Sequence, residues 1–71
     1  MATDICVRLG KRIRALRKAR QWRQIDLAEH AGIHKNHISE LERGQREIGL
    51  TNLEAIAVAL DITPDRILRD L

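Results

Sequence analysis

Hydrophobic residues recur along the chain at the spacing of α-helices. The first set predicts an amphipathic helix from about Asp4 to Arg20, because its members fall at intervals of four, four and three residues. These are Ile5, Leu9, Ile13 and Leu16. Cations occupy the opposite face of this helix, namely Arg8, Lys11, Arg14 and Lys18.

Two glycines divide the middle of the chain. Gly32 and Gly44 are natural left-handed caps, and they predict the ends of two helices, Gln24–Ala31 and Lys35–Arg43. A loop, Gln45–Leu50, follows the second of these helices. The segment from Gln24 onward therefore predicts two short helices joined by a tight turn.

Two start signals open the remaining helices. Thr51 and Glu54 have the spacing of a capping box. In such a box the Thr51 side chain accepts from the backbone N–H of the third helical residue, and the Glu54 side chain reaches back to the Thr51 backbone N–H. Thr63-Pro64-Asp65 combines a cap, a proline at the first helical position and an acid at the positive end of the helix dipole. The inner stripe of the fourth helix is Leu53, Ile56, Ala57 and Leu60, and the apolar edge of the fifth is Ile67, Leu68 and Leu71.

Composition supports a helical domain with an aliphatic core. The chain has one Trp, no Phe and no Tyr, and its apolar mass is Leu, Ile and Ala, which pack readily in helices. Seventy-one residues allow one domain, so residues 1–71 are predicted to form a single all-α unit of five compactly packed helices.

Charge is distributed unevenly along the chain. Residues 1–23 hold eight cations and one anion, whereas residues 24–71 hold five cations and nine anions. A basic first third favours a polyanion partner, nucleic acid before a membrane surface. The alternative is a solvated helix face with no partner.

Several classes of protein are disfavoured. No apolar run approaches the roughly 20 residues that span a bilayer, and the N-terminus lacks the apolar region of a signal peptide. The single Cys6 cannot form an internal disulfide, which agrees with a reducing compartment, so we expect a cytoplasmic protein that starts at Met1. The chain is short for an enzyme with a substrate cleft. His30, His34 and His37 lack paired metal-ligand spacing, and we expect no metal, cofactor or small-molecule ligand.

The segment from Gln24 to Arg43 has the pattern of a helix-turn-helix. Ala28 is small where two helices cross closely, and Gly32 takes the turn conformation that a side chain resists. Apolar anchors fix both helices on the core: Leu27, Ile33, Ile38 and Leu41. The remaining face of the second helix points outward and fits the major groove of B-DNA.

Three segments of the chain carry a family resemblance. Gln24–Ile33, Ile38–Gly44 and Leu53–Leu60 resemble the helix-turn-helix family of Cro and the phage repressors, and the likeness extends from about Leu9 to Leu68. The resemblance implies a five-helix, lambda-repressor-like fold that binds operator DNA as a dimer. Within the family, His34–Ser39 and Glu42–Leu53 are similar to the controller proteins of restriction–modification systems, which regulate their own gene and the endonuclease gene. The chain departs from the family pattern at Arg23, His34, Ile48 and Asp61.

The first turn of the recognition helix, and one position in the turn after it, carry the candidate base-reading residues. Lys donates to guanine, Asn pairs with adenine, and Glu accepts from cytosine. These residues are Lys35, Asn36, His37 and Glu40. Candidate contacts to the DNA backbone flank them, namely Arg23, Gln24, Arg43, Gln45 and Arg46.

The resemblance also implies a structural ion pair between Arg17, late in the first helix, and Glu42, at the end of the recognition helix. It further implies that Gln24 supports the recognition helix while holding a phosphate. Trp22 is expected to cap the core between the first two helices rather than stack on a base.

The last helix, about Pro64 to Leu71, is the candidate dimerisation element. Ile67, Leu68 and Leu71 exceed what a short terminal helix buries, and a two-fold axis would place two recognition helices about 34 Å apart. Further candidate interface residues are Ile48, Leu50 and Ile62. The alternative is that these residues only close the monomer core.

Together these features predict a homodimeric transcription regulator that binds a palindromic operator. RNA polymerase is a further candidate partner, through an acidic patch at Glu47 and Glu54. The alternative is an antitoxin-like interaction module that uses its apolar surface for a protein partner and binds DNA secondarily.

Overall fold

A computed structural model describes residues 4–71, and within that range the chain forms five α-helices and no strand. They are α1 (Asp4–Ala19), α2 (Gln24–Ala31), α3 (Lys35–Glu42), α4 (Leu50–Ala59) and α5 (Pro64–Leu68). The predicted all-α, five-helix class is therefore confirmed. α1 and α3 each end one residue before the predicted position, which is ordinary for helix ends, whereas α5 ends at Leu68 and not at about Leu71 as predicted.

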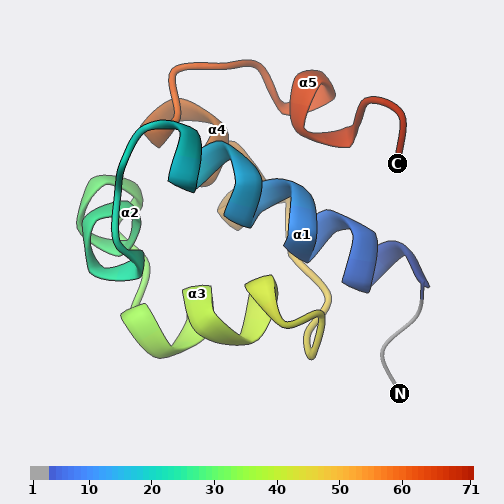
Figure 1. Cartoon of the computed structure of the whole chain (residues 1–71), viewed down its shortest axis with the longest axis horizontal. Helices are drawn as coiled ribbons and strands as arrows, with labels where there is room; N and C mark the ends of the chain where they lie inside the picture. Colours follow the sequence, from blue (N-terminus) through green and yellow to red (C-terminus); the bar gives the residue numbers. More distant parts are fainter. Residues whose placement is uncertain (1–3) are drawn as a thin grey trace.

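The long helix α1 lies at the centre of the arrangement. It packs on α3 and on α5, while α2 packs on α3 and α4. Figure 1 shows α1 running across the middle, with α3 below it and α5 above it. The recognition helix and the last helix thus lie on opposite sides of α1.

One isoleucine or leucine from each helix reaches the centre of the core. The largest side chains with almost no exposure are Ile13, Leu27, Ile38, Ile56 and Ile67. The core is aliphatic, as the composition predicts. None of the helices in residues 4–71 is long and apolar enough to cross a membrane.

The buried stripe of α1 is rotated from the predicted one at its amino end. Ile5 is 51% exposed, whereas Cys6 is buried beside Leu9 and Ile13. The prediction for Ile5 is therefore wrong. The spacing of four residues placed Ile5 on the stripe, but the neighbours of this end of α1 cover position 6 instead.

The start of α4 also corrects a prediction. The helix begins at Leu50 with Gly49 as its cap residue, and no side chain makes a capping hydrogen bond there. Thr51 already lies in the first turn, so the capping box of Thr51 and Glu54 does not form. At α5 the cap position is Thr63 and Pro64 opens the helix as predicted, but the Thr63 side chain makes no cap bond to the backbone.

Three helices are followed by a residue other than glycine that has a left-handed backbone, and one of these residues is Asp70 after α5, with φ 59°. Gln21 follows α1 with φ 60°, and Asp61 follows α4 with φ 57°. Asp61 is one of the positions where the chain departs from the family pattern, and aspartate tolerates this conformation better than most residues. Gly32 takes the same conformation after α2, with φ 68°, as predicted.

Candidate nucleic-acid interface

The recognition helix α3 begins with a histidine cap. His34 has an extended backbone, and its ring Nδ1 accepts a hydrogen bond from the Asn36 backbone N–H at 3.1 Å. An imidazole therefore does what a serine hydroxyl usually does at this position. The bond requires a neutral ring with its proton on Nε2. The sequence showed only that the usual serine was missing.

The cap holds the first turn of α3 at the surface. Lys35 and Asn36 are exposed, and His37 and Glu40 are partly buried. On the other side of the same helix, Ile38 and Leu41 are buried in the core. The structure thus brings the four candidate base-reading residues to the outer part of one helix.

Two candidate DNA contacts are joined to each other. Arg46, in the loop after α3, donates from Nη1 to Glu40 Oε1 at 3.2 Å. Both side chains are partly exposed, so the pair lies at the surface. The pair uses one nitrogen of the Arg46 guanidinium and one oxygen of the Glu40 carboxylate. The remaining candidate backbone contacts of this loop, Arg43 and Gln45, are exposed.

Arg23 is also engaged within the protein. Its guanidinium donates to the Asp26 carboxylate at 3.2 and 3.3 Å, and its backbone N–H donates to the same carboxylate at 2.7 Å. Asp26 therefore satisfies a free N–H at the start of α2, at the position where Arg23 departs from the family pattern. The Arg23 side chain holds the pKa of Asp26 below its usual value.

A buried network ties the carboxyl end of α3 to α1 and α2. The Arg17 guanidinium donates to both carboxylate oxygens of Glu42, at 2.7 and 3.0 Å. The Gln24 side-chain amide donates to the same carboxylate at 3.2 Å. Arg17 also donates to the Trp22 carbonyl at 2.7 Å. Arg17 and Glu42, expected as a structural ion pair, thus form the centre of a larger cluster that includes Gln24.

Trp22 packs against the core and carries two further ring contacts. It stacks on the His30 ring with centroids 4.3 Å apart, and the Arg20 guanidinium lies 4.7 Å from the Trp22 ring centre. His30 also contacts the Asp26 carbonyl at 2.8 Å. Within residues 4–71, no cluster of three His, Cys, Asp or Glu residues is placed to hold a metal ion.

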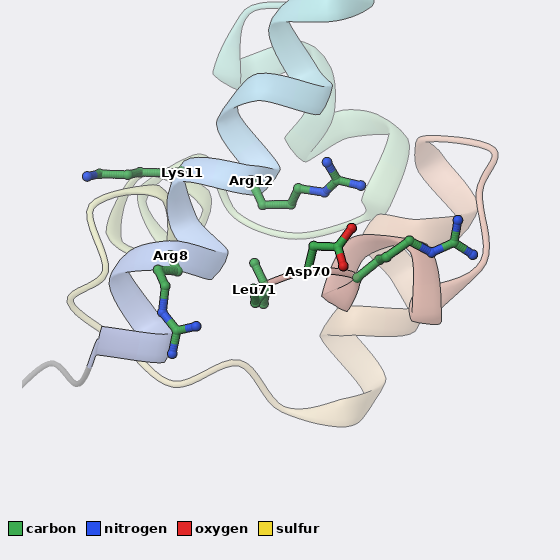
Figure 2. A pocket seen from close by; sticks show the side chains of 6 residues that line it. Arg8, Lys11, Arg12, Asp70 and Leu71 are labelled. Atoms are coloured by element: carbon green, nitrogen blue, oxygen red, sulfur yellow. The ribbon is translucent and has the colours of Figure 1, made fainter.

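Part of the basic charge in α1 and just after it supports the fold. Arg12 donates to the Arg66 carbonyl at 2.8 Å, and Arg20 donates to the Leu60 carbonyl at 3.1 Å. A cavity of about 380 Å³ lies beside Arg12 between α1 and the end of the chain, and Figure 2 shows that the charged groups of Arg8, Lys11 and Arg12 point in different directions around it. This basic surface is on the α5 side of α1, away from α3.

The candidate dimer residues fall into three groups. Ile67 has 0% exposure, so it belongs to the monomer core and its assignment to an interface is wrong. Ile48, Ile62 and Leu71 are partly buried against the core. Of the six candidate interface residues, all of which lie in the described part of the chain, only Leu50 and Leu68 are exposed, at 83% and 41%.

An apolar cavity joins some of these residues. It has a volume of about 280 Å³ and lies between the start of α1, the loop before α4 and the end of α5. Exposed Ile5 lies at its edge, and the sequence missed this residue because it was assigned to the core. The lining is Ile5, Cys6, Leu9, Glu47, Ile48, Leu53 and Leu68.

The helix-turn-helix family model matches residues 13–67. The chain belongs to the helix-turn-helix family. The control protein C.BamHI of Bacillus amyloliquefaciens is 33% identical over 69 residues, which cover 96% of this chain and 85% of that protein. The immunity repressor of Bacillus phage phi105 is 41% identical over 54 residues, which cover 76% of this chain but 38% of the repressor.

Solved structures give the same assignment. The restriction–modification controller protein C.AhdI from Aeromonas hydrophila matches with a TM-score of 0.86 at 39% identity, covering 87% of this chain and 94% of that one. The DNA-binding domain of the C2 repressor of Salmonella phage P22 matches with a TM-score of 0.82 at 39% identity, covering 87% and 82%. This helix-turn-helix transcriptional regulator therefore resembles both controller proteins and phage repressors.

Proposed function

We propose that this helix-turn-helix protein is a homodimer that regulates transcription by binding a two-fold symmetric operator. The observation that carries the proposal is the first turn of α3. It is capped by His34, it exposes Lys35 and Asn36, and its opposite face is fixed in the core. A helix held in this way presents side chains to base edges in the major groove.

The flanking residues supply contacts to phosphates. Arg43 and Gln45 are exposed beyond the end of α3, while Arg23 and Arg46 reach DNA by exchanging their carboxylate partners for phosphates. Gln24 lies at the start of α2, where the free N–H groups and the helix dipole favour an anion. These contacts set affinity and register and carry little sequence information.

The dimer interface forms on the α5 side of the molecule. Leu50 and Leu68 are exposed apolar side chains, and Ile5 joins Leu68 at the edge of one apolar cavity. Partly buried Ile48, Ile62 and Leu71 extend this surface. Leu68→Glu is expected to shift dimer to monomer in sedimentation equilibrium, and an unchanged dimer mass would place the interface elsewhere.

Regulation follows from occupancy of the operator. A dimer bound over a promoter blocks polymerase, and a dimer bound just upstream recruits it through Glu47 and Glu54, which are both exposed. The match over most of the length of C.BamHI and C.AhdI supports a controller protein that regulates its own gene together with an endonuclease gene. Such a protein works in the cytoplasm, on the nucleoid, and has no catalytic role.

The second candidate function is an antitoxin-like interaction module. The exposed apolar residues Leu50, Val58 and Leu68 favour it, because a toxin would cover them equally well. In that case DNA binding is secondary and depends on the protein partner.

The deciding experiment is selection of bound DNA from a random pool at about 150 mM salt, which suppresses non-specific phosphate binding. We expect a two-fold symmetric motif with half-sites about 10–10.5 base pairs apart. A motif that matches the DNA upstream of the gene supports autoregulation. Recovery of no motif by folded protein contradicts the operator proposal and favours the interaction module.

A further inference from the structure

A glycine lies in the middle of α1 at the point where this helix crosses α3. Gly10 is buried, and α1 continues through it from Asp4 to Ala19. Glycine destabilises a helix interior relative to alanine, because it has more backbone freedom to lose. Its presence here therefore conflicts with local propensity, and such conflicts point to a tertiary requirement.

The requirement is a direct contact between two backbones. A Cβ atom on Gly10 would lie 2.4 Å from the Leu41 carbonyl oxygen and 2.6 Å from the Glu42 carbonyl oxygen. Both distances are far below van der Waals contact, and both atoms belong to the backbone of the last turn of α3. Neither can move aside as a flexible side chain would. Any side chain at position 10 must therefore push α1 and α3 apart.

A second close contact lies further along the same seam. A Cβ atom on Gly44, just after α3, would lie 2.8 Å from the Val7 Cα atom of α1. Val7 and Gly10 are three residues apart and so share one face of α1. A hydrogen alone fits at Gly10 in α1 and at Gly44 just after α3, and α1 rests on the carboxyl end of α3 over about one turn.

We propose that Gly10 is a positioning residue for DNA recognition, with Gly44 as its counterpart. The contact between Gly10 and the backbone of α3 sets the distance between α1 and α3. This distance in turn determines how deeply the first turn of α3 enters the major groove. Binding residues need to be held within about 0.5 Å of their working positions. A shift at the carboxyl end of α3 moves Lys35 and Asn36, because they lie on the same rigid helix. This inference rests on the proposed operator binding.

The contact differs in kind from the ion pair beside it. Arg17 and Glu42 hold α3 through long side chains, which adapt to small displacements by changing their torsion angles. The Gly10 contact involves only backbone atoms and has no such freedom. The ion pair therefore keeps α3 attached, while the glycine contact fixes its distance from α1.

The test compares Gly10→Ala with the wild type on two DNA duplexes. One carries the motif selected by the wild-type protein, and the other is a scrambled duplex of equal length. The quantity of interest is the ratio of the two dissociation constants, measured by fluorescence anisotropy. A folding defect weakens binding to both duplexes by the same factor, because each constant is divided by the same folded fraction. The ratio therefore reports the geometry of the bound protein, even for a partly unfolded variant.

Two further variants complete the design. Gly44→Asn adds a Cβ against Val7, while asparagine tolerates the left-handed backbone of that position, where φ is 71°. Gly49→Ala is the matched control, because a Cβ on Gly49 would meet no atom within 4 Å. Circular dichroism records the helix content of all three variants.

We expect Gly10→Ala and Gly44→Asn each to lower the specificity ratio about tenfold, as much as the loss of one base contact. Gly49→Ala should leave the ratio unchanged. Equal weakening on both duplexes by Gly10→Ala and Gly44→Asn would overturn the proposal and leave the glycines a role in stability alone. A wild-type protein that shows no preference between the duplexes would instead contradict the proposed function, which separates the two failures.

Discussion

The two ends of the recognition helix α3 are built in opposite ways. At the amino end, Lys35 and Asn36 are exposed, and a single hydrogen bond from the Asn36 N–H to His34 caps the helix. At the carboxyl end, Leu41 and Glu42 are buried beneath α1, and Glu42 accepts three hydrogen bonds from Arg17 and Gln24. The protein thus fixes α3 at one end and leaves the other end exposed at the surface.

This division separates stability from recognition. Changes at the carboxyl end should lower the free energy of unfolding, because they disturb buried groups. Changes at the amino end should alter DNA binding and leave most of the stability intact. The predictions below follow that order, from the largest expected effect to the smallest.

Glu42→Ala is expected to have the largest effect. It leaves the buried Arg17 guanidinium without its carboxylate, and breaking a buried pair by removing one partner costs about 3–5 kcal/mol. Urea denaturation followed by circular dichroism measures this loss. The double variant Arg17→Met/Glu42→Leu serves as the control, and it should recover much of the stability because no charge is left unpaired. A loss below about 1 kcal/mol for Glu42→Ala, typical of a surface pair, would contradict the tight attachment of this end.

Lys35→Ala and Asn36→Ala should act on recognition alone. Each is expected to weaken binding to the selected motif by about 1–3 kcal/mol and to relax the preference for one base pair. Both side chains are exposed, so the urea midpoint should stay near the wild-type value. Equal weakening on motif and random DNA would remove these residues from the base-reading set.

His34→Ala tests how much the cap of α3 contributes to stability. Removal of the ring acceptor leaves the Asn36 N–H without its partner and is expected to cost about 1 kcal/mol of unfolding free energy. His34→Ser restores a side-chain oxygen at this position and should recover most of that loss. If alanine and serine give the same urea midpoint, the hydrogen bond at 3.1 Å contributes nothing measurable.

Arg46→Ala should have the smallest effect on specificity. Loss of one phosphate contact is expected to flatten the slope of log affinity against log salt concentration by about one unit, equally on motif and random DNA. The release of Glu40 from its ion pair with Arg46 offsets part of the loss in affinity. Titrations at several salt concentrations measure the slope, and an unchanged slope would exclude Arg46 from the backbone contacts.

Local patterns in the sequence determined the helices and the outward face of α3. Gly32 and Pro64 mark helix boundaries because their backbone preferences act within a few residues, independently of the rest of the chain. The spacing of buried anchors such as Leu27 and Ile38 likewise follows from helix geometry. These features made the five helices and the candidate base-reading residues predictable.

Capping was only partly predictable, because several residues compete for each free N–H group. The box expected at Thr51 does not form, since α4 starts at Leu50 and its cap residue is Gly49. His34 caps α3, although histidine is not a favoured cap residue. At α2 the Asp26 carboxylate accepts the N–H of the cap residue Arg23. The choice between such partners depends on where the preceding chain enters the helix.

By itself, the sequence determined the helix-turn-helix, the outward face of α3 and the ion pair that the family resemblance implies. Only the tertiary structure decided which side of α1 is covered, that Ile67 belongs to the core, and that Gly10 meets the backbone of α3. The reason is physical: periodicity and capping act between residues a few positions apart, whereas burial and close approach depend on segments about 30 or more residues away that pack together only in the folded chain.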